Sequence, residues 1–435
     1  MKKIMKLLFA MAIMAAGALL ASGLLYASIR AAESGDTPIS PAQYQTMLGK
    51  GMDVDWSKTG AGRKNYSEAA VKNFKKANIQ HVRIRVKDST SAELFQSLDG
   101  QINDCLNNGL IPVLAYQANE FKNSVSEESM SKAVAWWKET AEHYKDYSYL
   151  LAFDLLIECS DALNKQPEKL NEYIEKAVSE IRVSNPQRIL IMSPRVRSDA
   201  AYLNDLKIPT QANGYMMAEW HFYASGPSKE NQRKLWTTGT KKEKSLINEK
   251  INLALAWQKK TGIPTWVGAW MAGNYNDGND YSIEEQVKFA HYMVTQLEAA
   301  KIPFAVNSDT KFYNRETNTW VKKMLPLRYC IFTSYKTAQN MLFKEKKCTV
   351  PSAKPVSKNN LQITWKKLKN ADGYEVVLST SPKCNKQKKQ YVVSSTKKKI
   401  KNLKGKKYYI KIRGYIKSSG KKVYSKYSKI KSVKL

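Results

Sequence analysis

Eight short apolar runs alternate with longer segments of helical period between Met52 and Leu342. The runs are Met52–Trp56, Gln80–Val86, Ile111–Tyr116, Leu150–Leu156, Ile189–Met192, Tyr215–Phe222, Thr265–Gly268 and Pro303–Val306. Parallel strands need long, usually helical, crossovers, so eight strand–helix units predict an α/β fold, a (β/α)8 TIM barrel over residues 38–343. An open doubly wound sheet is the alternative. No Gly-rich phosphate loop follows the first run, so nothing supports nucleotide binding.

Helical periodicity and capping signals support the segments between these runs. In Lys169–Val183 the apolar residues Leu170, Ile174, Ala177, Val178 and Ile181 share one face. Ser282 and Glu285 have the spacing of a capping box. A stripe of Ile283, Val287, Ala290, Val294 and Leu297 follows them.

A second module follows the barrel. Residues 344–355 are charged and contain proline, which predicts a linker. Beyond them the period becomes two, for example at Leu361, Ile363 and Trp365, with turns between the runs, so residues 356–435 are predicted to form an all-β sandwich. The segment Leu403–Tyr408 resembles the tyrosine corner of a fibronectin type III domain, and Trp365 resembles its core tryptophan. This resemblance implies an immunoglobulin-like fold.

The N-terminal 32 residues read as an export segment of a bacterial protein. A basic start, MKKIMK, precedes the apolar run Leu7–Ile29 and several small residues. We expect a signal peptide cleaved after Ala27 or Ala31. The alternative is an uncleaved membrane anchor, since the run is long enough to span a bilayer. Either reading predicts a secreted or cell-surface protein.

The cysteines and the charge limit the partners. Five cysteines show neither metal-binding spacing nor a dense disulfide pattern, so they predict no metal site. We also expect no cofactor and a monomer. Of the net charge of +33, residues 351–435 contribute +23, from 25 Lys and Arg against 2 Asp and Glu. Such a module outside the cell is expected to attract anionic cell-wall polymers. No nucleic-acid motif is visible, so nucleic acid is not expected.

Polar side chains stand near the ends of the predicted strands, where a (β/α)8 barrel holds its active site. Glu158 follows a buried run, and alternation places Glu219, His221 and Tyr223 on one strand face. With Arg83 these residues are the predicted catalytic set. The predicted substrate-binding residues are Gln117, Asn307 and Asp309, together with the aromatic residues Trp56 and Trp270. Glu219 and Glu158 could instead be structural partners of a strand arginine.

This set resembles glycoside hydrolase family 5, the cellulase-like members of a large clan of retaining barrels. The resemblance implies that Glu158 is the acid/base, that His221 lies beside it, and that Arg83 and Tyr223 steady a nucleophile. Three positions depart from the family pattern. Ala269 stands at the nucleophile, Ile157 replaces an asparagine that holds the sugar 2-hydroxyl, and Tyr116 or Gln117 replaces a histidine.

The resemblance implies hydrolysis of O-glycosidic bonds in a β-linked polysaccharide or oligosaccharide. The flat faces of Trp56 and Trp270 would suit the pyranose rings of such a substrate. Retention needs a second carboxylate roughly 5–5.5 Å from the acid, which Ala269 cannot supply. Glu219 or Asp309 could act instead as a base on water, with inversion. Two alternatives remain: an inactive barrel kept to bind glycans at the cell wall, and a structural spacer. We expect Ala269 to face the cavity of Glu158 and to leave a gap there.

Overall fold

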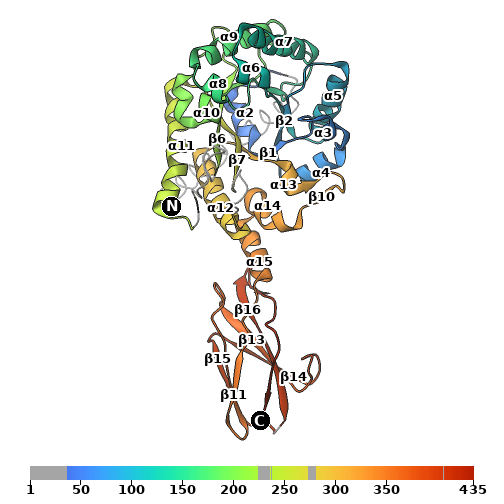
Figure 1. Cartoon of the computed structure of the whole chain (residues 1–435), viewed down its shortest axis with the longest axis vertical. Coiled ribbons are helices and arrows are strands. Elements are labelled where there is room, and N and C mark those ends of the chain that lie inside the picture. Colours follow the sequence, from blue (N-terminus) through green and yellow to red (C-terminus); the bar gives the residue numbers. More distant parts are fainter. Residues whose placement is uncertain (1–36, 224–235, 237, 273–280, 405) are drawn as a thin grey trace, which may run out of the picture. The chain divides into compact units, whose positions relative to one another are not determined.

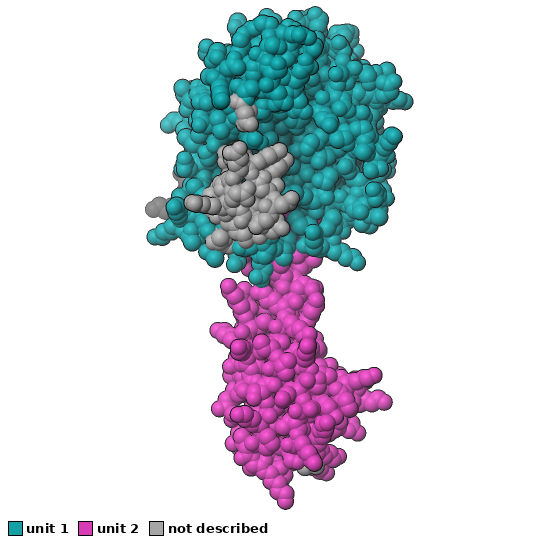
Figure 2. Space-filling model, viewed as in Figure 1, with its two compact units in different colours: residues 1–324 teal, residues 325–435 magenta. Residues whose placement is uncertain are grey.

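The computed structural model describes residues 37–223, 236, 238–272, 281–404 and 406–435. By its internal contacts the chain divides into two compact units, residues 1–324 and 325–435 (Figure 2). The predicted leader, residues 1–32, lies outside the described residues. Among the described helices, none has the length and apolar character that a membrane crossing requires.

The first unit is a closed parallel barrel whose eight strands follow one another in chain order, with β8 pairing to β1 (Figure 1). Its strands are β1 (Lys50–Val54), β2 (His81–Val86), β3 (Ile111–Tyr116), β4 (Ala152–Asp154), β5 (Leu190–Met192), β6 (Met216–Tyr223), β7 (Thr265–Met271) and β8 (Phe304–Asn307). The (β/α)8 prediction is therefore confirmed, and the open sheet is excluded. Strand β4 is shorter than predicted, so Glu158 lies in the loop beyond it.

Helices surround the strands. They are α2 (Pro41–Leu48), α3 (Gly60–Lys64), α4 (Glu68–Lys76), α5 (Ala92–Asn107), α6 (Asn119–Ser124), α7 (Glu127–His143), α8 (Asp161–Asn164), α9 (Pro167–Ser184), α10 (Arg195–Ser198), α11 (Lys241–Thr261), α12 (Ile283–Ala300) and α13 (Asp309–Phe312), with short 3-10 turns η1 (Ala200–Asp205) and η2 (Lys322–Met324). A short hairpin pairs β9 (Tyr313–Asn314) with β10 (Thr319–Trp320), two strands of two residues each.

Local sequence signals explain where these helices begin and which face they bury. Helix α12 starts at the predicted capping box, in which Ser282 accepts from the backbone N–H of Glu285 and the Glu285 side chain accepts from that of Ser282. Helix α9 buries its predicted stripe. Helix α12 does the same except at Ile283, which is only half-buried. The apolar stripes hold the helices against the barrel because their burial removes the most apolar surface from water.

The second unit contains two helices and two antiparallel sheets. The helices are α14 (Leu325–Phe332) and α15 (Tyr335–Glu345). One sheet has the order β11 (Ser352–Ser357), β12 (Asn360–Thr364), β15 (Lys397–Ile400). The other has the order β14 (Lys388–Val393), β13 (Gly373–Ser379), β16 (Lys407–Ser418), β17 (Lys421–Tyr424), and β18 (Lys431–Lys434) also pairs with β16. The two sheets share an apolar core that includes Leu361, Ile363, Trp365, Val376 and Ile410.

The boundaries differ from those expected. Helix α15 belongs to the second unit, where the Asn340 side chain donates to the Ser418 hydroxyl at 2.9 Å. Residues 344–355, predicted to be a linker, contain the end of α15 and most of β11. Strand β11 is mostly exposed and lies at the edge of its sheet, so it shows no apolar alternation by which sequence reasoning could detect it.

Candidate active site

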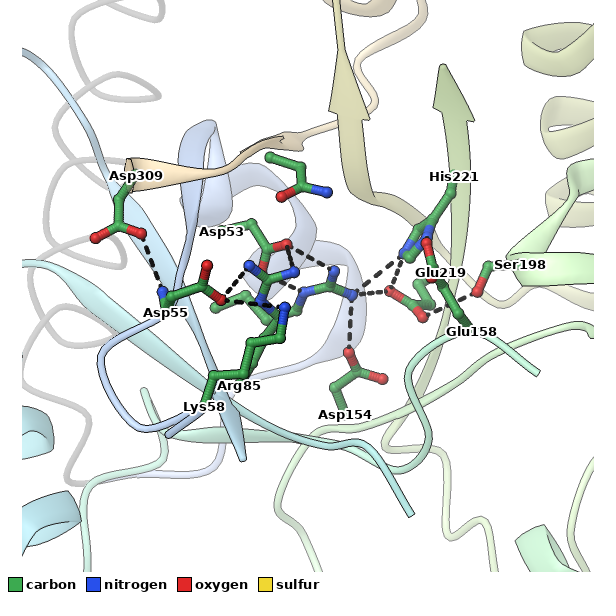
Figure 3. Close-up of polar contacts among 12 residues, drawn as sticks. Asp53, Asp55, Lys58, Arg85, Asp154, Glu158, Ser198, Glu219, His221 and Asp309 are labelled. Carbon is green, nitrogen blue, oxygen red and sulfur yellow. Dashed lines mark hydrogen bonds and ion pairs between the residues drawn. The ribbon is translucent and has the colours of Figure 1, made fainter. Parts of the chain in front are cut away.

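A fully buried arginine organises the interior of the barrel. Arg83 on β2 is 1% exposed, and it binds Asp53 on β1, which is labelled in Figure 3, with two hydrogen bonds, Nε to Oδ1 at 3.0 Å and Nη2 to Oδ2 at 3.1 Å. Its Nη1 donates to Asp154 on β4 at 3.2 Å and to Glu219 on β6 at 2.7 Å. Four strands are therefore tied together by one guanidinium, a geometry suited to bidentate ion pairs.

The charges in this group depend on one another. Burial, and next the charge of Glu219, raise the pKa of Asp154 well above its usual value. Burial also opposes ionisation of Glu219, but the charges of His221 and Arg83 outweigh it and lower the pKa of that carboxyl. Glu219 further accepts from the Ser193 hydroxyl at 2.8 Å. Glu219 is thus an anion held in place by its partners.

Gly268 on β7 makes room for this arrangement. A Cβ atom at this position would lie 1.8 Å from Glu219 Oε2 and 2.9 Å from Arg83 Nη1. Because both side chains are fixed by several partners, neither can move away cheaply. Only glycine lets the strand pass so close to the ion pair.

His221 connects the buried network to the barrel mouth. Its Nε2 lies 3.0 Å from Glu219 Oε2 and its Nδ1 lies 3.0 Å from Glu158 Oε1. Burial would lower the pKa of His221, but the charge of Glu219 and the hydrogen bonds to both carboxylates raise it to about 9. A protonated imidazole donates through both ring nitrogens, which fits its two acceptors.

Glu158 lies at the mouth within reach of both predicted neighbours. Besides its contact with His221, it accepts from the Tyr223 hydroxyl at 3.2 Å, and Asn307 Nδ2 donates to that hydroxyl at 3.1 Å. Its backbone is left-handed, with φ of 53°, a strained conformation that is common at functional sites. Burial would raise its pKa, but His221, Lys122 and Arg83 lower it far below the usual range. Glu158 is therefore an anion at neutral pH.

A pocket of about 380 Å³ opens over Glu158. Among the described residues that line it, Glu158 is the only carboxylate, whereas six are cationic: Lys58, Arg83, Arg85, Lys87, Lys122 and Arg197. The predicted residues Gln117 and Asn307 also line it. Its volume lies within the range of small-molecule sites.

Two predicted sugar-stacking residues lie in the core instead. Trp56 is fully buried against Tyr66 and Phe74, with ring centroids 5.1 and 5.9 Å away. Trp270 is fully buried against Phe289 and Phe304, at 6.0 and 5.6 Å. The prediction that they bind sugar was wrong. Trp270 lies within β7 and only Trp56 lies past its strand, and a position near a strand end does not decide on which side of the strand a side chain lies.

Ala269 does not leave the expected gap. It pairs with His221 in register, but it is fully buried and packs with Tyr223 and Met271. A register shift in β7 between Val267 and Trp270 changes the alternation there.

The two carboxylates considered as substitute bases do not line the pocket. Glu219 is enclosed by its partners. Asp309 is fully buried, accepts from the backbone N–H of Asp55 at 3.0 Å and lies 3.7 Å from Arg315. Burial raises the pKa of Asp309 to about 6. Asp309 therefore supports the loop after β1 and not the pocket wall.

Sequence reasoning missed four cations of the pocket, Lys58, Lys87, Lys122 and Arg197. They lie in or next to the loops that follow β1, β2, β3 and β5, which is where a (β/α)8 barrel places its functional groups. Their position after a strand was the available signal, but surface lysines and arginines are too common for it to stand out. In the described part of the chain, no group of three or more His, Cys, Asp and Glu is arranged to hold a metal ion.

A closed parallel barrel with polar groups at the carboxyl ends of its strands is the arrangement found in (β/α)8-barrel enzymes. A family model described as cellulase (glycosyl hydrolase family 5) matches residues 41–308. The chain belongs to this family. It is by this membership a glycosidase, of the class that hydrolyses O-glycosyl compounds.

Solved structures share the fold. An endoglucanase matches with 19% identity and a TM-score of 0.59, over 68% of this chain and 100% of its own. Thermotoga maritima Cel5A in complex with cellobiose matches with 24% identity and a TM-score of 0.57, over 67% and 99%. The cellulose synthase subunit Z of Clostridioides difficile matches with 21% identity and a TM-score of 0.55, over 66% and 98%. A comparison with curated protein sequences gives no match.

The raised pKa of His221 predicts a fall in stability with pH. The folded state keeps the proton up to about pH 9, whereas an unfolded histidine loses it near 6.5, so the stabilisation is complete below pH 6.5 and is lost as pH rises through 9. Between pH 6.5 and 8 we expect the free energy of unfolding to fall by about 1–2 kcal/mol. Urea unfolding at the two pH values measures it.

The control separates His221 from other groups. In His221→Gln this pH dependence should become much weaker, with only the raised pKa of Asp154 acting in the same direction, whereas His143→Gln, at an exposed site, should keep it in full. The measurement stops at pH 8 because burial lowers the pKa of Lys122 to about 8. Above that pH the folded state loses the Lys122 proton before the unfolded state does, so Lys122 makes stability rise with pH. An unchanged slope in His221→Gln would contradict a protonated His221.

Proposed function

We propose that the chain cleaves an O-glycosidic bond of a β-linked glycan in the pocket over Glu158, and that Glu158 is the carboxylate on which this reaction depends. The observation that carries the proposal is the placement of Glu158. It lies in the loop after β4, lines the pocket, and is held by His221 and Tyr223. Structural relatives are described in complex with cellobiose and mannotriose, which supports an oligosaccharide as the ligand.

The charges favour inversion over retention. A retaining mechanism needs a carboxylate nucleophile roughly 5–5.5 Å from the acid, and Ala269 stands at that position. An anionic Glu158 suits the base that takes a proton from water as the water attacks the anomeric carbon. The leaving oxygen then needs a proton, and Lys122, which lines the pocket with a pKa lowered by burial to about 8, is suited to donate it.

The first-formed anomer tests this mechanism. We expect proton NMR of the product, recorded before mutarotation, to show inverted configuration at the anomeric carbon. Retained configuration would mean that a nucleophile acts in a place other than the Ala269 position and would overturn the single-carboxylate mechanism.

A second candidate function is glycan binding without turnover. Two observations favour it: Ala269 packs against Tyr223 and Met271, and the low pKa of Glu158 makes it a poor general acid. This function predicts saturable binding of a β-linked oligosaccharide with no release of reducing ends, measured over days with high protein concentration.

We further propose that the protein is exported as a monomer, by means of the basic and apolar leader, and that residues 356–435 are a fibronectin type III-like domain. The shared core of the two sheets supports the domain proposal. So does Tyr408, whose hydroxyl donates to the backbone carbonyl of Lys404 at 3.1 Å, the contact of a tyrosine corner.

The net charge of +23 in residues 351–435 supports binding to anionic cell-wall polymers through charge alone. We expect the full-length chain to sediment with purified anionic cell walls at low salt. At about 1 M salt, where charges act over only ~3 Å, it should stay in solution. Sedimentation that is unchanged at 1 M salt would contradict binding through charge.

Matched variants locate the binding surface. Replacing four exposed lysines of the module by glutamine (Lys388, Lys389, Lys397 and Lys399) should weaken wall binding. Replacing four exposed lysines of the barrel unit in the same way (Lys76, Lys241, Lys242 and Lys259) should change it much less. Equal effects of the two sets would assign the binding to overall charge and not to the module.

A further inference from the structure

The wall of the pocket over Glu158 has an unusual composition for a sugar site. Small-molecule pockets are mostly lined by apolar and aromatic side chains with a few polar groups. Among the described residues of this wall, none is aromatic, and Lys, Arg, Asn and Gln predominate. A neutral pyranose ring would find no flat apolar face on these residues.

Three of the six pocket cations are already neutralised by carboxylates beneath the pocket. Arg83 binds Asp53, Asp154 and Glu219. Arg85 pairs with Asp53 and Asp55 (Figure 3), and Lys58 lies 3.6 Å from Asp55. These cations hold the barrel mouth in shape and leave little charge for a ligand.

The other three, Lys87, Lys122 and Arg197, form no ion pair with any described residue. Lys122 gives the strongest indication of a missing anion, because it is only 5% exposed. Its Nζ donates to Gln117 Oε1 at 3.0 Å and to the Ile157 carbonyl at 2.8 Å, which are both uncharged acceptors. A buried ammonium without an ion-pair partner is costly, so its place at the pocket calls for an anion that is supplied from outside.

Arg197 is fixed toward the same pocket by its backbone. Val196, Arg197 and Ser198 all have left-handed φ values, of 57°, 56° and 60°. The Val196 N–H donates to Asn164 Oδ1 at 2.7 Å, and the Ser198 hydroxyl contacts that of Ser193 at 2.5 Å. Three consecutive non-glycine residues rarely adopt this conformation, so the surrounding bonds hold Arg197 in one position.

Glu158, the single anion among the described residues of the wall, cannot balance these charges. Glu158 already accepts from His221, which is itself a cation at neutral pH. One cation would be enough to balance Glu158, but three unpaired cations share the pocket with it. The described wall therefore carries a positive charge that a neutral glycan would not use.

We propose that this pocket binds a glycan unit bearing a negative charge, a carboxylate or a phosphate, with Arg197, Lys87 and Lys122 around the anionic group. The inference rests on the proposed function, because it names the class of glycan that enters the same pocket. Arg197 can engage two oxygens of either group with its fork of N–H donors, whereas the two lysines act as point charges.

Two oligosaccharides that differ in one group test the proposal. Cello-oligosaccharides oxidised at C6 carry a carboxylate where the unmodified compound of equal length carries a CH2OH group. By calorimetry we expect the full-length chain to bind the acidic compound about tenfold more tightly, or better, as for hydrogen bonds to charged groups. A C6-phosphorylated compound of equal length, compared with the acid, shows which anion the pocket prefers.

Variants place the effect in the pocket. Arg197→Gln and Lys87→Gln should each reduce the preference for the acidic compound severalfold. Lys76→Gln, an exposed lysine near the end of α4, should leave it unchanged. Glu158→Gln removes the one anion that the described residues contribute to the wall, and it should tighten binding of the acidic compound, but not of the neutral one.

Each outcome decides between the two proposals. Equal affinity for the acidic and neutral compounds would overturn the anionic class, while pocket glycan binding would still stand. A preference that survives Arg197→Gln and Lys87→Gln, but is lost when the four module lysines are replaced, would place the anion on the module and also overturn it. If no compound binds, both this inference and the proposed function fail.

Discussion

Replacing Arg83 by methionine is expected to destabilise the barrel by about 3–5 kcal/mol, the usual cost of removing one partner from a buried ion pair. The loss is large because Arg83 compensates Asp53 and Glu219 and also donates to Asp154, whose pKa is raised, and all four side chains are shielded from water. Methionine has a similar volume, so a cavity contributes little. The carboxylates left behind must then be buried as uncompensated charges or take up protons.

Urea unfolding followed by tryptophan fluorescence measures this change, since nine of the ten tryptophans lie in residues 56–320 and report mainly on the barrel. Arg63→Met is the matched control. Arg63 pairs with Asp88 at 2.7 Å, but both side chains are partly exposed, so a loss of at most about 1 kcal/mol is expected. Similar losses in the two variants would show that the Arg83 network does not hold the barrel together.

The second large effect is expected on turnover. Glu158→Gln keeps the shape of the side chain but removes its ability to take a proton, and general-base catalysis contributes about 10²–10⁴-fold to a rate. We therefore expect kcat to fall by two to four orders of magnitude. KM should change far less, because the other pocket residues remain. Initial rates of reducing-end release on β-linked oligosaccharides measure both constants.

Asp309→Asn is the control for this experiment. Asp309 is a buried carboxylate after β8 that does not line the pocket, so its replacement should leave kcat within a few-fold. If Asp309→Asn abolished turnover and Glu158→Gln did not, the base would be Asp309. If the unmodified chain bound glycans but released no reducing ends, the binding function would replace hydrolysis.

Much of the barrel follows from local sequence. Strand and helix periods, together with the capping box at Ser282, depend on neighbours within a few residues, and this is why the eight strands were predictable. Alternation along β6 likewise placed Glu219, His221 and Tyr223 on one face, and position after β4 placed Glu158 near them. The resemblance to the family also implied that Ala269 stands at the nucleophile position, but it gave no information on what surrounds that residue.

The tertiary structure alone decided which of these groups meet solvent. Trp56 and Trp270 are as flat and apolar as a sugar platform requires, but helix packing buried them. A shift in register on β7 put Ala269 against Tyr223 and Met271, and Gly268 allowed the enclosure of Glu219 by Arg83. Lys122 and Arg197 come from loops after different strands. Their shared positive pocket depends on contacts between residues far apart in the chain, which no local period encodes.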